Sequence, residues 1–221
     1  MRQKNLKLWI VLLLVIGLIK SPAQTIKDID NNVYETINIG NQTWMKENLK
    51  TSRLNDGTSI PLVTDSISWT NLETPGYCWY NNDETSYKNV YGALYNWYTV
   101  NSKKLCPIGW HVPADAEWTS LINYLGGSGV AGGKLKEIGT VHWKDPNIGA
   151  TNETNFTALP GSFRGSYIGK FFPLGVTCNW WTATEFKATH AWYYYIYNDM
   201  TYSRKTILDK KHGISVRCIK D

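Results

Sequence analysis

The sequence predicts an α+β fold with few helices, short antiparallel strands and long irregular loops. Two segments, 36–45 and 191–197, alternate their side chains as half-buried strands do. Only residues 115–125 combine a helix start, an apolar stripe and a glycine stop. From about residue 129 onward, glycine-rich loops separate short strands. Strands and a helix in one chain, without regular alternation, favour α+β over α/β.

Residues 1–23 have the pattern of a secretory signal peptide. Arg2, Lys4 and Lys7 form a basic start, residues 8–19 are an uncharged apolar run, and 21–23 supply small residues for cleavage. The apolar run is shorter than the roughly 20 residues that span a bilayer as a helix. We therefore expect export to the periplasm, the cell surface or the medium. Residues 24–221 are expected to form a single domain without a transmembrane segment.

Removal of that segment also changes the charge of the chain. The full sequence carries a formal net charge of +5, but four of its 23 basic residues and none of its 18 acidic residues lie within 1–23. The remaining chain is therefore close to neutral. Nucleic acid partners, which a basic balance would favour, are not expected.

The first expected element is a β-hairpin over residues 36–45, with a Gly-Asn turn at 40–41. Residues 54–61 and 71–76 are rich in Asn, Gly, Thr and Pro, which predicts loops. Residues 91–98 are predicted to be a helix. They place four side chains on one face at helical spacing, namely Tyr91, Leu94, Tyr95 and Tyr98.

The clearest helix is predicted to begin after Asp115 as its N-cap and to stop at Gly126-Gly127. Its apolar stripe consists of Trp118, Leu121, Ile122 and Leu125. In the strand at 191–197, Trp192, Tyr194 and Ile196 face one way, while Tyr193, Tyr195 and Tyr197 face the other. A last strand is expected at 214–219.

Four cysteines are compatible with two disulfides in an exported protein: Cys78, Cys106, Cys178 and Cys218. Three pairings are possible on these residues alone. No two of them have C-x-x-C spacing, and no histidine lies close to a cysteine or to another histidine as structural zinc ligands do. Disulfides are therefore favoured over a zinc site.

Seven motifs resemble those of one protein family. They lie at residues 39–49, 77–83, 91–98, 106–113, 158–161, 180–185 and 215–221. In sequence and in order they resemble the Fibrobacter succinogenes major paralogous domain family, exported bacterial proteins that are common in Bacteroidetes. The resemblance covers nearly all of residues 24–221. The family is more distantly similar to the C-type-lectin-like fold and its formylglycine-generating-enzyme branch.

The resemblance implies a C-type-lectin-like domain whose first and last strands pair and whose long loops gather on one side. It also implies that Cys106 and Cys218 form one disulfide and that Cys78 and Cys178 form a second. The family does not imply an activity.

Catalytic motifs are missing from the chain. There is no G-x-S-x-G elbow and no H-E-x-x-H helix, and residues 165–171 read as a glycine turn rather than a phosphate loop. The reactive cysteine pair of the formylglycine-generating enzymes has no counterpart, because Cys178 and Cys218 are far apart in sequence. His111 is expected to be a hydrogen-bonded histidine that fixes a strand-to-helix turn. We therefore expect a protein without enzymatic activity.

The aromatic residues favour a ligand-binding function instead of a catalytic one. The chain has 11 Trp and 14 Tyr, whose flat apolar faces and polar edges suit sugar rings and protein interfaces. The predicted ligand-binding aromatic residues are Trp180, Trp181, Trp192, Tyr194 and Tyr202.

Calcium-dependent sugar binding is a more specific form of this binding hypothesis. Asp145-Pro-Asn147 and Asn198-Asp199 are similar to the Glu-Pro-Asn and Trp-Asn-Asp elements of sugar-binding C-type lectins, although they lie further apart in sequence. Asp145, Asn147, Asn198 and Asp199 are thus candidate ligands, since carboxylate and amide oxygens coordinate Ca²⁺.

These observations favour an exported, non-catalytic module that recognises glycan or protein at the bacterial cell surface through an aromatic-rich loop face. Two alternatives stay open: an enzyme on the same scaffold that acts on envelope glycans, and a structural adhesin without a small ligand. The oligomeric state is also open.

Overall fold

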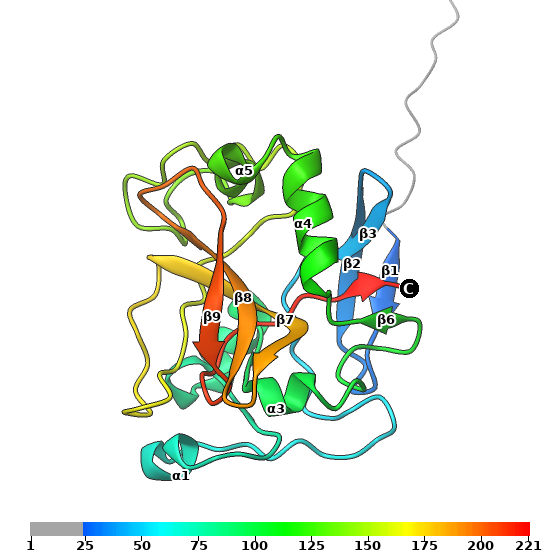
Figure 1. The fold of residues 1–221 in the computed structure, drawn as a ribbon, viewed down its shortest axis with the longest axis vertical. Coiled ribbons are helices and arrows are strands. Elements are labelled where there is room, and N and C mark those ends of the chain that lie inside the picture. The colour runs from blue at the N-terminus through cyan, green and yellow to red at the C-terminus, as the bar shows by residue number, and fades with distance from the viewer. Residues whose placement is uncertain (1–23) are drawn as a thin grey trace, which may run out of the picture.

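The computed structural model describes residues 24–221, and the predicted signal peptide at 1–23 lies outside them. Within this range the chain forms a five-stranded, a three-stranded and a two-stranded sheet with a few short helices (Figure 1). All named strands pair in antiparallel fashion. The predicted mixture of few helices and short antiparallel strands is thus observed.

The five-stranded sheet joins the two ends of the described chain. Its order is β1 (Thr25–Lys27), β2 (Val33–Ile39), β3 (Gln42–Met45), β10 (Ile219–Lys220) and β6 (Trp110–His111). The predicted hairpin is confirmed, because β2 and β3 pair around Gly40, whose φ of 62° suits glycine. Ile219 of β10 pairs with Trp44 on one side and His111 on the other. The last strand therefore lies between the N-terminal hairpin and β6. The resemblance implied that the first and last strands pair, but β1 pairs with β2, and β10 joins the same sheet through β3.

One of the two expected disulfides is present. Cys106 and Cys218 are bonded, beside the point where β6 meets β10. The expected Cys78–Cys178 disulfide is wrong, because both thiols are free and buried. Cys78 packs with Trp69 and Leu94, whereas Cys178 belongs to a different cluster of the core. Burial raises the pKa of the Cys78 thiol to about 12, which keeps it protonated and unreactive.

Helix α4 (Asp115–Tyr124) confirms the predicted central helix and buries Trp118, Leu121 and Ile122. Its N-cap is Ala114 rather than Asp115. The Glu117 carboxylate accepts the Ala114 N–H at 2.7 Å, so the first turn is capped from inside the helix. The Asp115 carboxylate accepts instead from the ammonium of Lys205 at 2.9 Å.

The predicted helix at 91–98 is wrong. Helix α2 (Glu84–Tyr91) ends where this helix was expected to begin, because Gly92 has a φ of 76° and lies against the Leu49 backbone. Strand β5 (Leu94–Tyr95) then pairs with β4 (Tyr77–Cys78). The Asn96 side chain caps a separate short helix, α3 (Trp97–Val100). Both predicted loops, 54–61 and 71–76, lie outside the named elements.

The three-stranded sheet consists of β7 (Thr177–Lys187), β8 (His190–Tyr197) and β9 (Arg204–Asp209). The predicted strand at 191–197 is confirmed as most of β8. One face of the sheet packs on α4, where Trp118 stacks on Tyr194 with ring centroids 5.2 Å apart. The strand expected at 214–219 is broken: Ile214 and Ser215 make isolated bridges, and the named strand starts at Ile219.

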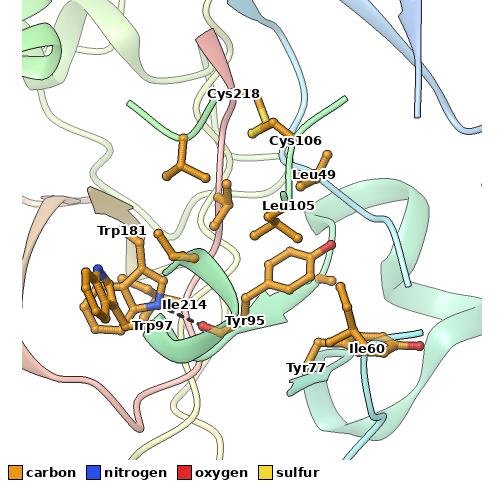
Figure 2. Close-up of a cluster of buried hydrophobic side chains, with 14 of the residues drawn as sticks. Leu49, Ile60, Tyr77, Tyr95, Trp97, Leu105, Cys106, Trp181, Ile214 and Cys218 are labelled. Atoms are coloured by element: carbon orange, nitrogen blue, oxygen red, sulfur yellow. Dashed lines mark hydrogen bonds between the residues drawn. A yellow bond between two sulfur atoms is a disulfide. The ribbon is translucent and has the colours of Figure 1, made fainter. Parts of the chain in front are cut away.

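Three short elements complete the described fold: α1 (Ser66–Thr70), the 3₁₀ turn η1 (Tyr80–Asn82) and α5 (Ser128–Leu135). Figure 2 shows one buried cluster, in which Leu49, Tyr95, Trp97 and Trp181 pack below the Cys106–Cys218 disulfide. No helix between residues 24 and 221 is long and apolar enough to cross a membrane.

Candidate functional site

Most of the predicted ligand-binding aromatic residues lie in the core. Trp180, Trp181 and Tyr194 are 1%, 0% and 5% exposed, so their assignment as ligand contacts is wrong. The first half of β7 is covered on both faces, because Trp180 packs on Trp118 of α4 and Trp181 donates to the Tyr95 carbonyl at 2.8 Å. Only the other two residues of the set are accessible: Trp192 is half-buried and Tyr202 is exposed.

The two predicted calcium elements do come together in space. The Asn198 amide donates to the Asp145 carbonyl at 3.0 Å, and the Ile148 N–H donates to the Asn198 carbonyl at 2.7 Å. However, the Asn147 amide donates to the Glu137 and Gly139 carbonyls, and its own oxygen is buried without a partner. Within residues 24–221 no cluster of three His, Cys, Asp or Glu side chains is placed to hold a metal.

A lysine ammonium lies where these two elements meet. The Lys136 side chain is 0% exposed, and its Nζ donates to the carbonyls of Ile148 and Met200, each at 2.9 Å, and of Tyr197 at 3.2 Å. An ammonium has three N–H donors, so these carbonyls satisfy it. Burial lowers the pKa of Lys136 to about 8, which leaves it mostly charged at neutral pH. The Lys136 ammonium is thus the cation that the carbonyl oxygens of these loops bind.

Lys136→Met should therefore be destabilising. The variant leaves at least three buried carbonyl oxygens without a donor, and we expect a loss of about 3 kcal/mol in the free energy of unfolding. Urea unfolding of the wild type, Lys136→Met and the control Lys134→Met measures it. Lys134 lies two residues earlier, in α5, and makes a surface ion pair with Glu153, so its loss should cost about 0.5 kcal/mol. Calcium that stabilised the wild type would show that the loops hold a metal and contradict this interpretation.

His111 has the structural role that the sequence predicts. Its Nδ1 lies 2.6 Å from the Asp221 carboxylate and its Nε2 lies 2.8 Å from that of Glu117. Partial burial alone would lower the pKa of His111, but these two hydrogen bonds outweigh it and raise the pKa. An apolar cavity of about 300 Å³, lined partly by Val100 and Leu105, lies beside it. Because both ring nitrogens are engaged, His111 joins Asp221 to α4 and has no free nitrogen for acid–base chemistry.

A more open pocket lies at the loop end of the molecule, near α1 in Figure 1. We call it the Tyr80 pocket, and its volume is about 390 Å³. It is lined by Ser66, Tyr80, Asn81, Asn82, Gly169, Lys170 and Phe171. Tyr80 and Phe171 form an aromatic wall with ring centroids 5.4 Å apart. Segments that are far apart in the sequence therefore build this pocket.

Residue types with unusual backbone freedom shape the pocket. Asn81 and Asn82 both have left-handed backbones, with φ of 52° and 58°. Asparagine tolerates this conformation better than most residues. Gly169 has a φ of 61°, and a Cβ there would lie 2.4 Å from the Ser66 carbonyl oxygen. Only glycine lets this loop pack directly on the start of α1.

The buried Arg164 side chain joins two of the segments that form the pocket. Its guanidinium is fully buried and donates to the carbonyls of Gly169 at 2.8 Å, Val63 at 2.6 Å and Thr64 at 2.8 Å. It also lies 4.7 Å from the ring centre of Trp69, within cation–π range. A single side chain thus fixes the segment before α1 against the loop that carries Lys170 and Phe171.

Several polar groups of the pocket are free to meet a ligand. Asn81 and Lys170 are exposed, and neither side chain bonds to another residue within 24–221. The Asn82 amide donates to the Thr64 carbonyl at 3.1 Å, which leaves its oxygen as an acceptor. The pocket therefore combines an aromatic wall with donors and acceptors.

The sequence patterns did not identify the residues of the Tyr80 pocket as ligand contacts. Tyr80, Asn81 and Asn82 lie within residues 77–83, which served only to support the family resemblance. Lys170 and Phe171 lie in the segment interpreted as a glycine turn. One available signal was the pair of asparagines directly before Asp83, the N-cap of α2. Two adjacent asparagines outside a helix favour a left-handed turn that exposes both side chains.

Comparison with known proteins identified one family. The family described as the Fibrobacter succinogenes major domain matches residues 37–220. Comparisons with curated proteins and with solved structures gave no match. The matched range includes every residue that lines the Tyr80 pocket and both cysteines of the disulfide.

Proposed function

We propose that this chain, which belongs to the Fibrobacter succinogenes major domain family, is an exported, non-catalytic module that binds glycans through the Tyr80 pocket. The pairing of β10 with β3 supports a C-type-lectin-like fold for this module. The Cys106–Cys218 disulfide supports export, because disulfides persist in oxidising compartments.

The observation that carries the proposal is the composition of the pocket. Tyr80 and Phe171 offer apolar ring surface, on which the C–H face of a sugar can stack. Asn81, Asn82 and Lys170 offer free donors and acceptors, which sugar hydroxyls require. An apolar surface with a few convergent polar groups is typical of ligand sites.

A protein partner is the second candidate, and exposed apolar side chains favour it. Ile67, Ile168 and Phe172 are 73%, 56% and 41% exposed, and they lie next in sequence to the pocket residues Ser66, Gly169 and Phe171. Apolar residues beside a polar pocket are typical of protein interfaces. If the Ile168→Ser variant still binds glycan, glycan binding depends on the pocket and not on this apolar rim.

Glycan binding should depend on the Asn81 side chain. Asn81→Gly removes the amide but keeps the left-handed backbone, so the pocket should stay folded. Loss of one or two hydrogen bonds to a sugar should weaken binding roughly tenfold. A glycan array followed by calorimetry, with residues 24–221 in the disulfide-bonded form, measures this.

Asn31→Gly is the matched control. Asn31 has a φ of 64° and is exposed in the turn between β1 and β2, so the same change is made on the same kind of backbone elsewhere. Wild-type protein that binds no glycan would contradict the proposed function. Equal binding by Asn81→Gly and the wild type would contradict the proposed site.

A further inference from the structure

A second polar pocket lies apart from the Tyr80 pocket and shares no residue with it. It has a volume of about 150 Å³. Its lining consists of Lys46, Glu47, Asn48, Val90, Thr157, Leu159 and Arg217. We call it the Arg217 pocket.

Arg217 has unused hydrogen-bond donors. The side chain is 1% exposed, and its partners are Asn48 and Phe156 rather than a carboxylate. Nε and Nη2 donate to the Asn48 Oδ1 at 3.2 and 3.0 Å, and Nη1 donates to the Phe156 carbonyl. A guanidinium carries five N–H donors. Two of them therefore have no acceptor within residues 24–221.

Asn48 fixes the guanidinium. Its Oδ1 also accepts the indole N–H of Trp180 at 2.9 Å, and its amide donates to the Tyr91 carbonyl at 3.0 Å. Its oxygen, which accepts from both Arg217 and Trp180, is fully used within the protein. Its role is to hold Arg217 in one orientation, with Trp180 bonded to the same oxygen.

Glu47 supplies an acceptor in the same pocket. One of its oxygens accepts the Glu35 N–H at 2.9 Å, which leaves the other free. The neighbouring Lys46 ammonium, which also lines the pocket, is paired with Glu35 at 2.6 Å. Val90 and Leu159 add apolar wall. The pocket thus holds a cationic donor, an anionic acceptor and an apolar surface.

We infer that the Arg217 pocket binds an acetamido group. The carbonyl oxygen of the ligand accepts from Arg217, its N–H donates to Glu47, and its methyl group packs on Val90 and Leu159. A simple anion would meet repulsion from Glu47, and a simple cation would meet repulsion from Arg217. A neutral amide satisfies both, and a volume of about 150 Å³ accommodates a group of this size.

Acetamide titration, followed by the indole N–H resonance of Trp180, tests the inference. We expect saturable shifts with a dissociation constant of roughly 1 mM, as for a very small ligand. Val90→Phe fills the pocket without removing any of its hydrogen bonds, and it should weaken binding at least about tenfold. Val130→Phe, the matched control on an exposed valine of α5 outside the pocket, should bind as the wild type does. Val90 and Val130 are 38% and 45% exposed, so both variants should fold.

Three further probes define the ligand class. Methyl N-acetylglucosaminide and N-acetylglycine methylamide carry the same acetamido group on a sugar and on a peptide. The compound that binds more tightly identifies whether the acetamido group comes from a glycan or from a peptide. Acetate has the shape of acetamide but lacks its N–H. Acetate that binds as tightly as acetamide would make this an anion site and overturn the amide assignment. An unshifted Trp180 resonance with acetamide, or equal shifts in Val90→Phe, would overturn the pocket itself.

Discussion

Replacing Arg164 with methionine is expected to lower the free energy of unfolding by about 4 kcal/mol and to abolish glycan binding. The methionine fills similar volume but removes three charge-assisted hydrogen bonds, those to the carbonyls of Val63, Thr64 and Gly169. The Val63 carbonyl then has no donor within residues 24–221, whereas the Thr64 and Gly169 carbonyls keep one neutral donor each, from Asn82 and Ser66. Each hydrogen bond from a charged group contributes about 1.5–3 kcal/mol, and loss of the buried charge relieves part of this. Gly169 and its loop form one side of the Tyr80 pocket, so binding should be lost with the same change.

Denaturant unfolding and hydrogen exchange together check this prediction. Exchange should accelerate first at the loop around Gly169, while β2 and β3 stay protected. Arg204→Met is the control, because Arg204 is exposed and its removal should change stability by less than about 0.5 kcal/mol. A stable Arg164→Met variant that still binds glycan would show that Arg164 does not organise the pocket.

Removing the Cys106–Cys218 disulfide is expected to cost about 4 kcal/mol. The bond closes a sequence separation of 112 residues, and cross-links over such loops remove much of the entropy of the unfolded chain. It also holds β6 and β10 together, each of which has only two residues. The Cys106→Ser, Cys218→Ser double variant should therefore unfold at much lower urea concentration than the wild type.

A thiol count tests the pairing itself. Denatured but unreduced protein should show two reactive thiols, those of Cys78 and Cys178. Before denaturation neither should react, because both are buried. The Cys78→Ala, Cys178→Ala variant should keep its sensitivity to reducing agents. A count of zero or four thiols would contradict the observed pairing.

Strong periodicity predicted the elements that the structure confirms. The hairpin at 36–45, helix α4 and strand β8 each bury one face, and burial enforces the pattern that the sequence shows. The helix expected at 91–98 failed because Gly92 approaches the Leu49 backbone, a contact between distant segments. Local spacing contains no information about such a contact.

Functional residues were harder to predict than elements. Trp180 and Tyr194 look suited to ligands, but the packing of α4 on the sheet buries them. The calcium elements meet as expected, yet the Lys136 ammonium lies between the flanking carbonyls of Ile148 and Tyr197. The Tyr80 pocket depends on a loop that Arg164 fixes against the segment before α1. Each outcome follows from tertiary contacts between segments that are separate in the sequence.

The most direct test of the account is a titration of the disulfide-bonded protein with its tightest glycan, followed by the side-chain amide resonances of its asparagines and the ring resonances of its tryptophans and tyrosines. The account predicts saturable shifts of the Asn81 and Asn82 amides, with the Asn31 amide unchanged. Shifts confined to β8, at Trp192 or the half-buried Tyr195 and Tyr197, would place the ligand on the three-stranded sheet and contradict it.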